Sequence, residues 1–315
     1  MLLIFVLLFG MFLSIVATIY CSENTVNVLT ENIVTECDKL QVPYEIIFID
    51  DGSSDSSWMK IENLSKQIPV LKGIKLSRNF GQHYAISCGI EHAVGEWIFV
   101  MDGDLQDNPK EFKRFIDKTN EGFDVVVANR INRKDKFFKK IYSVVFWKLL
   151  SYLTGKPLHH SISNFGIYHK NAIHSVIRMR DYIRFFPTMI NWVGYKKTSI
   201  NVEHNARHEG NSTYSLNKMI RLAMDVIIVN SEKPLKLVIK TGFFISFISF
   251  IIGAAYFYRY ITNEIQVPGY ASIIISIWFL GGLIIFILGI LGMYLSKTFD
   301  SVKNRPYYII EKISP

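Results

Sequence analysis

The chain has 315 residues and a formal net charge of +8, from 35 Lys and Arg against 27 Asp and Glu. No charged residue precedes Glu23, and between Thr241 and Ser296 the only charged residues are Arg259 and Glu264. This uneven distribution excludes a wholly soluble protein and also a channel or transporter with many spans. It predicts one soluble domain joined to a membrane portion.

The uncharged N-terminal run, residues 1–20, leads into a predicted strand at Leu13–Tyr20. A signal peptide would carry basic residues ahead of its apolar stretch, and this run has none. We therefore favour a buried strand. Whether residues 1–12 extend this strand, precede the true start of the chain or contact the membrane stays open.

Strands and helices then alternate along the chain. The pattern predicts helices at 25–40, 56–66 and 83–93, and strands at 44–49, 70–76 and 97–101. Apolar strands without polar alternation, each followed by a helix, indicate a parallel sheet that is covered on both faces. The predicted fold class is α/β, and ligands are expected outside the carboxyl ends of the strands.

Two groups of aspartates follow strands of this predicted sheet. They are Asp50, Asp51 and Asp55 in the first group, and Asp102, Asp104 and Asp107 in the second. Several carboxylates in one crevice repel each other unless a cation or donors on a ligand lie between them. Oxygen ligands suit Mg²⁺ or Mn²⁺, which proteins usually share with substrate phosphates. In the alternative interpretation, the aspartates cap the helices that follow them.

Two uncharged runs near the C-terminus, Thr241–Tyr258 and Ile265–Ser296, are long enough to cross a bilayer core, which needs ~20 apolar residues. They predict a hairpin of two transmembrane helices within 237–296, at about 237–258 and 270–295, with glycines for close packing. Basic residues flank the pair on both outer sides. By the positive-inside rule the large domain and the tail, 297–315, are cytoplasmic. We expect a multi-pass protein of the cell (inner) membrane.

Two further segments, 135–153 and 215–229, combine an apolar helical face with interspersed lysines and arginines. This composition favours amphipathic helices in the membrane interface. The alternative is that both are core helices of the domain with solvated lysines.

Several motifs carry a resemblance to a known family. They are SIVATIY at Ser14–Tyr20, IDDGSSD at Ile49–Asp55, LSRNFG at Leu76–Gly81, MDGDLQD at Met101–Asp107 and RHEGNSTY at Arg207–Tyr214. Together with the predicted two-span tail, the chain resembles the family 2 inverting glycosyltransferases. It is most similar to the branch that transfers sugar to a polyprenyl phosphate, as bactoprenol glucosyltransferases and dolichyl-phosphate mannose synthases do.

The resemblance implies a cytoplasmic GT-A domain at 13–235 with a mostly parallel sheet. It implies a nucleotide-sugar donor, with a UDP-sugar favoured, undecaprenyl or another polyprenyl phosphate as acceptor, and inversion at the sugar. It also implies a Mg or Mn cofactor, a role in cell-surface polysaccharide synthesis or modification, and a homo-oligomer.

Residue roles follow from the same resemblance. Asp102 and Asp104 match the DxD motif, with Asp102, Asp104 and Gln106 as the metal-binding set and Gly103 beside the ribose. Thr18, Tyr20 and Asp51 match positions that hold the nucleobase and ribose, and Arg130, with Arg133 close by, matches basic residues that orient phosphates. We also expect Glu23 to bind the nucleotide sugar. Arg207 matches the arginine of the loop that closes over the diphosphate.

Three positions depart from the family pattern. The first motif reads Tyr20-Cys21-Ser22 where Tyr-Asn-Glu is usual, with an acid only at Glu23, and Thr213 stands where a lysine is common. Asn164 precedes Phe165 where many members have a proposed catalytic Asp.

Asparagine cannot accept a proton as a carboxylate does, which would argue against transfer to an alcohol. A phosphate monoester has a second pKa near ~6, so it is largely a dianion at neutral pH and needs no base. We expect Asn164 to position the acceptor or a sugar hydroxyl. The alternative is a loop residue that satisfies nearby backbone.

Other functions remain to be weighed. A catalytically silent relative that binds nucleotide sugar or lipid phosphate within a glycan-export assembly is favoured by Asn164 and Thr213, and opposed by Asp102, Asp104 and Arg207. A processive synthase would carry a QxxRW motif and more spans. Nucleic acid is disfavoured as a partner because no recognition motif accompanies the positive charge. The three cysteines have no CxxC spacing, which argues against a disulfide framework or a zinc site.

Overall fold

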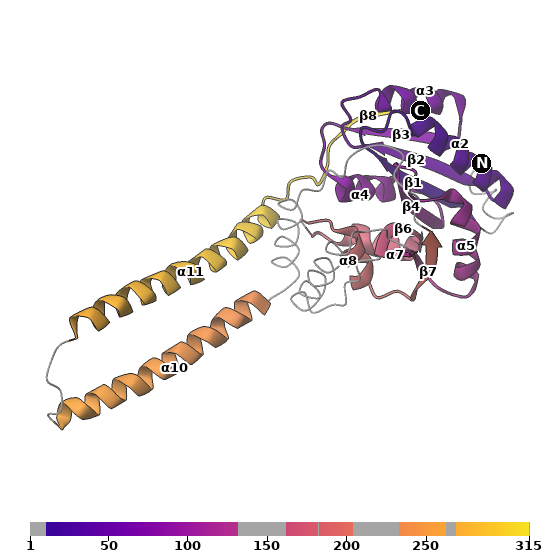
Figure 1. The fold of residues 1–315 in the computed structure, drawn as a ribbon. Coiled ribbons are helices and arrows are strands. Elements are labelled where there is room, and N and C mark those ends of the chain that lie inside the picture. The colour runs from indigo at the N-terminus through magenta and orange to yellow at the C-terminus, as the bar shows by residue number, and fades with distance from the viewer. Residues whose placement is uncertain (1–10, 132–161, 182, 204–232, 263–268, 315) are drawn as a thin grey trace. The chain divides into compact units, whose positions relative to one another are not determined.

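The computed structural model describes residues 11–131, 162–181, 183–203, 233–262 and 269–314 (Figure 1). The chain divides into two units. The α/β unit takes Met1–Ser143, His159–Thr213 and Arg305–Pro315, and the helical unit takes Val144–Leu158 and Tyr214–Asn304. The predicted interfacial helices at 135–153 and 215–229 lie outside the described residues.

The α/β unit contains an eight-stranded sheet in the order β7-β5-β6-β4-β1-β2-β3-β8. Its strands are β1 Leu13–Ile19, β2 Tyr44–Asp50, β3 Leu71–Leu76, β4 Trp97–Asp102, β5 Val125–Ile131, β6 Ile162–His169, β7 Lys197–Glu203 and β8 Ile310–Ile313. The predicted strand at Leu13–Tyr20 is confirmed as β1, in which every residue is buried. The three other strands expected from the sequence appear as β2, β3 and β4.

The central strands β3, β2, β1 and β4 are parallel, as the apolar pattern predicts. β6 is antiparallel to both β4 and β5, and β8 is antiparallel to β3. The sheet is therefore mostly parallel at its centre and mixed towards its edges. Because β1, β2 and β4 point the same way, the two aspartate groups that follow β2 and β4 emerge at one edge.

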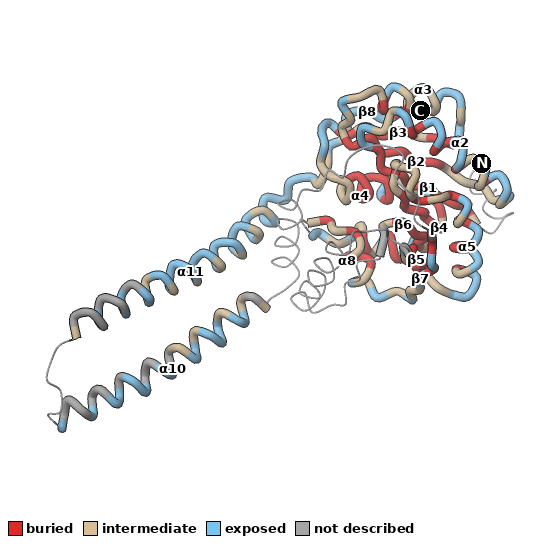
Figure 2. Tube along the Cα trace, viewed as in Figure 1, coloured by how far each residue is buried: buried red, intermediate tan, exposed pale blue. Residues whose placement is uncertain are grey.

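Helices cover both faces of the sheet (Figure 1). They are α2 Val26–Leu40, α3 Ser57–Gln67, α4 Gln82–His92, α5 Phe112–Asn120, α7 Lys170–Arg178 and α8 Phe186–Trp192, with the short 3₁₀ turn η1 Pro109–Glu111. Apolar residues of α2, α3 and α5 form one buried layer with the sheet. Residues of α4, α7 and α8 form the other layer. Figure 2 shows the sheet as the buried centre of this unit.

The C-terminal segment belongs to this sheet. Strand β8 pairs with β3, and the Ser314 N–H donates to the Gly73 carbonyl at 2.8 Å while the Gly73 N–H donates to Ser314 Oγ at 2.7 Å. Lys75 and Glu311 form an ion pair at 2.9 Å. Part of the segment predicted as a tail, 297–315, is therefore an edge strand of the sheet, and its first residues continue α11 to Val302.

This topology predicts that the α/β unit is weakened when the chain is cut before α10. A chain that ends at residue 232 loses β8, and β3 becomes an exposed edge. The two hydrogen bonds between Ser314 and Gly73, at about 1 kcal/mol each, correspond to a fall of roughly 4–8 °C in melting temperature. The comparison is with a chain in which a flexible Gly/Ser linker replaces 233–304, so that β8 is retained. Equal melting temperatures of the two proteins would show that β8 contributes no stability.

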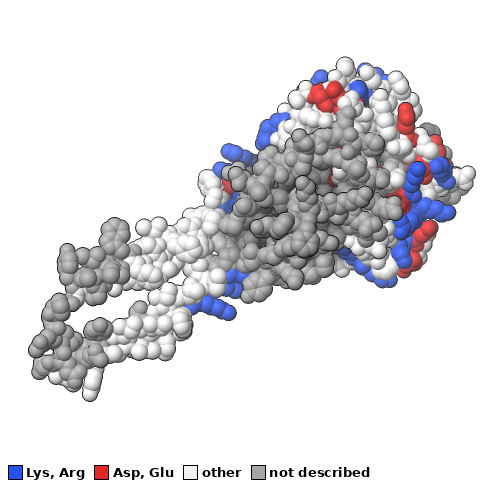
Figure 3. Space-filling model, in the orientation of Figure 1, with Lys and Arg blue, Asp and Glu red and all other residues white. Residues whose placement is uncertain are grey.

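The helical unit contains α10 Lys233–Ile261 and α11 Tyr270–Val302. Most of their described large apolar side chains are exposed, with Phe243 and Ile285 above 70% exposure (Figure 2). Among the described residues, Phe279–Val302 is long and apolar enough to cross a membrane, with a mean hydropathy of 2.3. Figure 3 shows described surfaces of both helices that are largely free of charge. That α10 is a second span stays a prediction.

Candidate active site

The candidate site lies at the carboxyl ends of β1, β2 and β4. Thr18 of β1 is in register with Asp102 of β4, and Ile19 is in register with Asp50 of β2. Backbone hydrogen bonds continue past the strand ends, from the Gly103 N–H to the Thr18 carbonyl at 3.1 Å and from the Asp51 N–H to the Ile19 carbonyl at 2.9 Å. The end of β1 therefore lies between the two aspartate groups, as the parallel pattern predicts.

The loop after β4 is held by its own carboxylates. Asp107 Oδ2 accepts from the Asp102 N–H at 3.1 Å, and Asp104 Oδ1 accepts from the Gln106 N–H at 3.2 Å. Between them Leu105 adopts the left-handed conformation with φ 62°. Such a backbone is unfavourable for a side chain other than glycine and is found where surrounding contacts impose it. The loop geometry thus fixes the positions of Asp102 and Asp104.

Gly103 is glycine because the site leaves no room for a side chain. A Cβ at this position would lie 2.7 Å from the Thr18 carbonyl oxygen and 2.5 Å from Ile19 Cδ1. Its own carbonyl accepts from the buried Thr25 hydroxyl at 2.9 Å. The middle residue of Asp-Gly-Asp is therefore set by close packing against β1 and the start of α2.

The aspartates after β2 are engaged by backbone rather than by each other. Asp51 is 3% exposed, and its two carboxylate oxygens accept from the Phe80 and Gly81 N–H groups at 2.8 and 2.9 Å. Asp55 accepts from the N–H groups of Ser57 and Glu23. The interpretation of these residues as caps, left open by the sequence, describes Asp55 at the start of α3.

Burial raises the pKa of Asp51 to about 6, while the hydrogen bonds from Phe80 and Gly81 oppose the shift. For an acid with a raised folded-state pKa, the stabilising contribution is full below the unfolded pKa of ~3.9 and is lost as the pH rises through the folded pKa. We expect the unfolding free energy to fall by about 2–3 kcal/mol from this group between pH 4 and 6.

The measurement is the ¹³C carboxyl shift of Asp51 against pH, assigned by its loss in Asp51→Asn. A midpoint near 6 is expected. Asp55 supplies the contrast: burial would raise its pKa, but hydrogen bonds from Ser57 outweigh burial and hold it below the usual value. An Asp51 midpoint at or below 4 would contradict the expectation.

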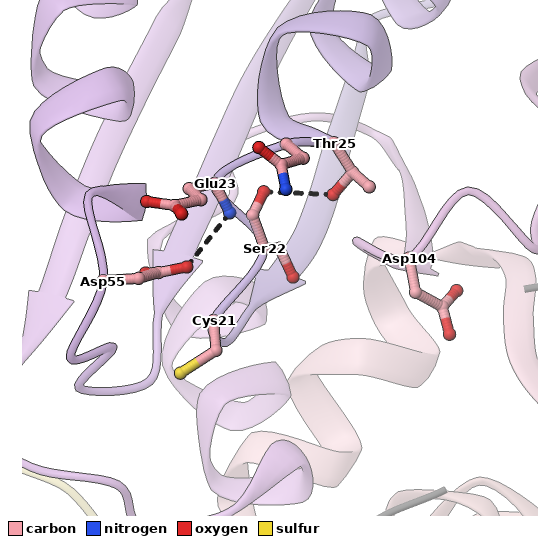
Figure 4. A pocket seen from close by; sticks show the side chains of 7 residues that line it. Cys21, Ser22, Glu23, Thr25, Asp55 and Asp104 are labelled. Atoms are coloured by element: carbon pink, nitrogen blue, oxygen red, sulfur yellow. Dashed lines mark hydrogen bonds between the residues drawn. The ribbon is translucent and has the colours of Figure 1, made fainter. Parts of the chain in front are cut away.

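A cavity of about 140 Å³ opens beside the loop after β4. It is lined by Cys21, Ser22, Glu23, Asn24, Thr25, Asp55 and Asp104. In Figure 4 Asp104 lies across this cavity from Glu23 and Asp55. Small-molecule sites usually measure ~300–1,000 Å³, so this cavity would hold one part of a larger ligand.

The residues predicted to hold the nucleotide surround the same edge. Tyr20 is 49% exposed directly after β1, whereas Thr18 is buried. The Glu23 carboxylate accepts from the Ser56 N–H at 3.0 Å, which links the cavity wall to α3. Arg130 lies in β5, and its side chain, like Arg133, Arg207 and Thr213, lies outside the described part.

Asn164 lies in β6, next to β4. The antiparallel register pairs Gly166 with Val100; Asn164 precedes Gly166 by two residues, and Asp102 follows Val100 by two residues. The Asn164 carbonyl accepts from the buried Tyr168 hydroxyl at 2.9 Å. Burial, then the nearby charges of Asp107 and Asp102, raises the pKa of Tyr168. The sheet therefore places Asn164 at the same edge as the DxD aspartates.

The oxygen donors of Asp102, Asp104 and Gln106 are of the kind that suits Mg²⁺ or Mn²⁺. Among the described residues, no three His, Cys, Asp or Glu side chains converge as a metal site. Two carboxylates and one amide still fit a cation that takes its remaining ligands from water and substrate phosphates. Cys37 and Cys88 are buried and Cys21 is exposed, all as free thiols.

Sequence reasoning missed two contributors to this edge, Gln82 and Thr25. Gln82 Nε2 donates to Asp102 Oδ1 at 2.5 Å, and Thr25 bonds Gly103 as described above. Thr25 could have been flagged as a hydroxyl at a predicted helix start. Gln82 carried no signal beyond following the LSRNFG motif.

Comparisons with known proteins place this site in a family. The profile described as glycosyl transferase family 2 matches residues 14–177. The uncharacterized glycosyltransferase YkcC of Bacillus subtilis is 33% identical over 300 residues, which cover 95% of this chain and 93% of that protein. An undecaprenyl-phosphate 4-deoxy-4-formamido-L-arabinose transferase of Pectobacterium atrosepticum is 30% identical over 305 residues, which cover 95% and 92%.

Among solved structures, glucosyl-3-phosphoglycerate synthase from Mycobacterium tuberculosis, in complex with Mn²⁺ and UDP-glucose, has a TM-score of 0.48 at 16% identity, over 70% of this chain and 78% of that one. The family profile spans more than half of the chain and includes the Asp50 and Asp102 groups. The chain therefore belongs to glycosyltransferase family 2, with its α/β GT-A-like fold, and is a glycosyltransferase.

Proposed function

We propose that this glycosyltransferase moves a sugar from a nucleotide-sugar donor, favoured to be a UDP-sugar, to undecaprenyl or another polyprenyl phosphate, with inversion. The observation that carries the proposal is the Asp102-Gly103-Asp104 loop beside a cavity at the end of β4. Full-length relatives named undecaprenyl-phosphate transferases support the acceptor class. The product would serve cell-surface polysaccharide synthesis or modification.

The chemistry follows from the charges at this edge. Sugar transfer develops positive charge on the sugar and negative charge on the departing diphosphate. A Mg²⁺ or Mn²⁺ ion held by Asp102, Asp104 and Gln106 would supply positive charge to that leaving group. Arg130 and Arg207 would add further positive charge to the phosphates.

The phosphate group of the proposed acceptor carries the negative charge that makes it a nucleophile. A phosphate monoester is largely a dianion at neutral pH, so attack at the sugar requires no proton transfer to the protein. Asn164, in β6 next to the end of β4, would position the acceptor or a sugar hydroxyl by hydrogen bonding. An amide at this position is consistent with a phosphate acceptor and inconsistent with an alcohol that needs a base.

A polyprenyl phosphate is presented at a membrane surface, and the helical unit supplies an apolar anchor. Phe279–Val302 of α11 meets the length and hydropathy of a span, and α10 carries Lys233, Lys236 and Lys240 at its start. We propose a two-helix anchor in the inner membrane, with the α/β unit and the C-terminus cytoplasmic. We extend the proposal to a homo-oligomer, which the family resemblance implies.

The test offers UDP-, GDP- and dTDP-sugars to the full-length protein in nanodiscs, with undecaprenyl phosphate and Mn²⁺ or Mg²⁺. Transfer of one sugar to the lipid is expected, with none to a free alcohol. Binding of a nucleotide sugar without transfer from any donor would overturn the proposal. That outcome would favour a catalytically silent subunit of a glycan-export assembly.

A further inference from the structure

The loop between β3 and α4 links the two aspartate groups. Its Phe80 and Gly81 bond to Asp51, and the next residue, Gln82, bonds to Asp102. Asp51 holds the Phe80 and Gly81 N–H groups on its two oxygens. Gly81 then takes φ +107°, which side chains rarely permit, and α4 begins at the next residue, Gln82. The Asp51 carboxylate therefore sets where the first residue of α4 lies.

From that position the side chain of Gln82 reaches the end of β4. Its Nε2 donates to Asp102 Oδ1 at 2.5 Å. An ionised carboxylate only accepts hydrogen bonds, so the amide nitrogen rather than its oxygen faces Asp102. Both side chains are half-buried, which limits competition from solvent.

The Gln82 amide that donates this hydrogen bond is neutral, so it does not cancel the negative charge of Asp102. A lysine or arginine at this position would orient Asp102 but would also neutralise it. An amide orients the carboxylate and leaves its negative charge for the cation. Hydrogen bonds of this kind to metal-binding carboxylates typically contribute 10–100-fold in metal affinity.

We propose that Gln82 is a positioning residue that orients the Asp102 carboxylate for divalent-cation binding. The inference rests on the proposed function for the presence of that cation. It predicts that loss of the amide weakens Mn²⁺ binding without unfolding the α/β unit. Gln82 acts through Asp102 and has no contact with the sugar in this role.

The variant that isolates the hydrogen bond is Gln82→Met, which keeps an unbranched side chain of similar length and removes the donor. Gln82→Asn keeps the amide on a side chain one methylene shorter. The control is Gln67→Ala, at the exposed end of α3. Each full-length protein is titrated with Mn²⁺ alone, and free Mn²⁺ is followed by electron paramagnetic resonance.

We expect the Mn²⁺ Kd to rise about 10-fold or more in Gln82→Met and Gln82→Asn, and to stay unchanged in Gln67→Ala. Melting temperatures should match that of the unsubstituted protein. With transfer as the second readout, the KM for Mn²⁺ should rise while kcat at saturating Mn²⁺ is retained, a split that general destabilisation would not produce.

An unchanged Kd in Gln82→Met with normal melting would overturn the inference, and so would a lower kcat that excess Mn²⁺ does not restore. A different outcome would reject the proposed function. A protein that binds Mn²⁺ with the expected Gln82 dependence but transfers no sugar would support the role of Gln82 and reject the polyprenyl-phosphate reaction.

Discussion

Replacement of Asp104 by alanine is expected to lower sugar transfer by about 10²–10³-fold. Removing one preorganised group that stabilises developing charge typically costs 10²–10³-fold in kcat. Asp104 is the one residue that both belongs to the DxD loop and lines the described cavity. The measurement is the initial rate of sugar transfer to undecaprenyl phosphate at saturating donor and Mn²⁺.

Two further variants separate charge from loop geometry. Asp104→Asn keeps an Oδ1 acceptor for the Gln106 N–H and removes the charge. We expect it to be nearly as inactive as Asp104→Ala. Glu31→Gln removes a carboxylate from the exposed face of α2 and should retain full activity. Substantial activity in Asp104→Asn would mean that loop conformation, not the carboxylate, is what the site requires.

The central strands of the sheet were predictable because each can be recognised from its own short stretch of sequence. Strands β1, β2 and β4 are mostly apolar, β3 alternates apolar residues with Lys72 and Lys75, and each strand lies within two residues of its predicted bounds. The parallel pattern predicts that both aspartate groups lie at one edge of the sheet, and the pairing of β2 and β4 with β1 puts Asp50 and Asp102 on either side of β1. The distribution of charge also separated the helical unit from the α/β unit, because the sequence of α10 and α11 contains long stretches without a charged residue.

The rest of the fold depends on contacts that leave no local trace. Strand β8 is a four-residue segment that follows α11 and pairs with β3, more than 230 residues earlier in the chain. In the candidate site, the sequence pattern predicted where the aspartates lie but not which groups they contact. Asp51 was expected to face the nucleotide, and its two oxygens accept from the Phe80 and Gly81 N–H groups, an arrangement set by tertiary approach. Its contact with a nucleotide stays a prediction.

The loop after β2 contacts the loop after β3 closely at Gly52, where we expect a substitution to lower the melting temperature strongly. Its φ is +67°, and an added Cβ would lie 2.4 Å from the Arg78 carbonyl carbon and 2.6 Å from the Asn79 nitrogen. Gly52→Ala therefore combines a left-handed backbone cost of ~1–2 kcal/mol with an overpacking cost of ~1–3 kcal/mol. Backbone atoms cannot yield as a flexible side chain does. The sum of about 2–5 kcal/mol should lower the melting temperature of the full-length protein by roughly 4–20 °C.

Gly122→Ala is the matched control, because Gly122 also has a positive φ, +84°, but the nearest described atom to its added Cβ is Lys196 Nζ at 3.6 Å. It isolates the backbone cost, and its melting temperature should fall by about 2–8 °C, less than that of Gly52→Ala. Gly52→Ala should also weaken Mn²⁺ binding, because the displaced segment carries Phe80, Gly81 and then Gln82. Equal melting of the two variants would contradict the overpacking argument. A Gly52→Ala protein with unchanged Mn²⁺ affinity would show that the loop after β3 moves without disturbing Asp102.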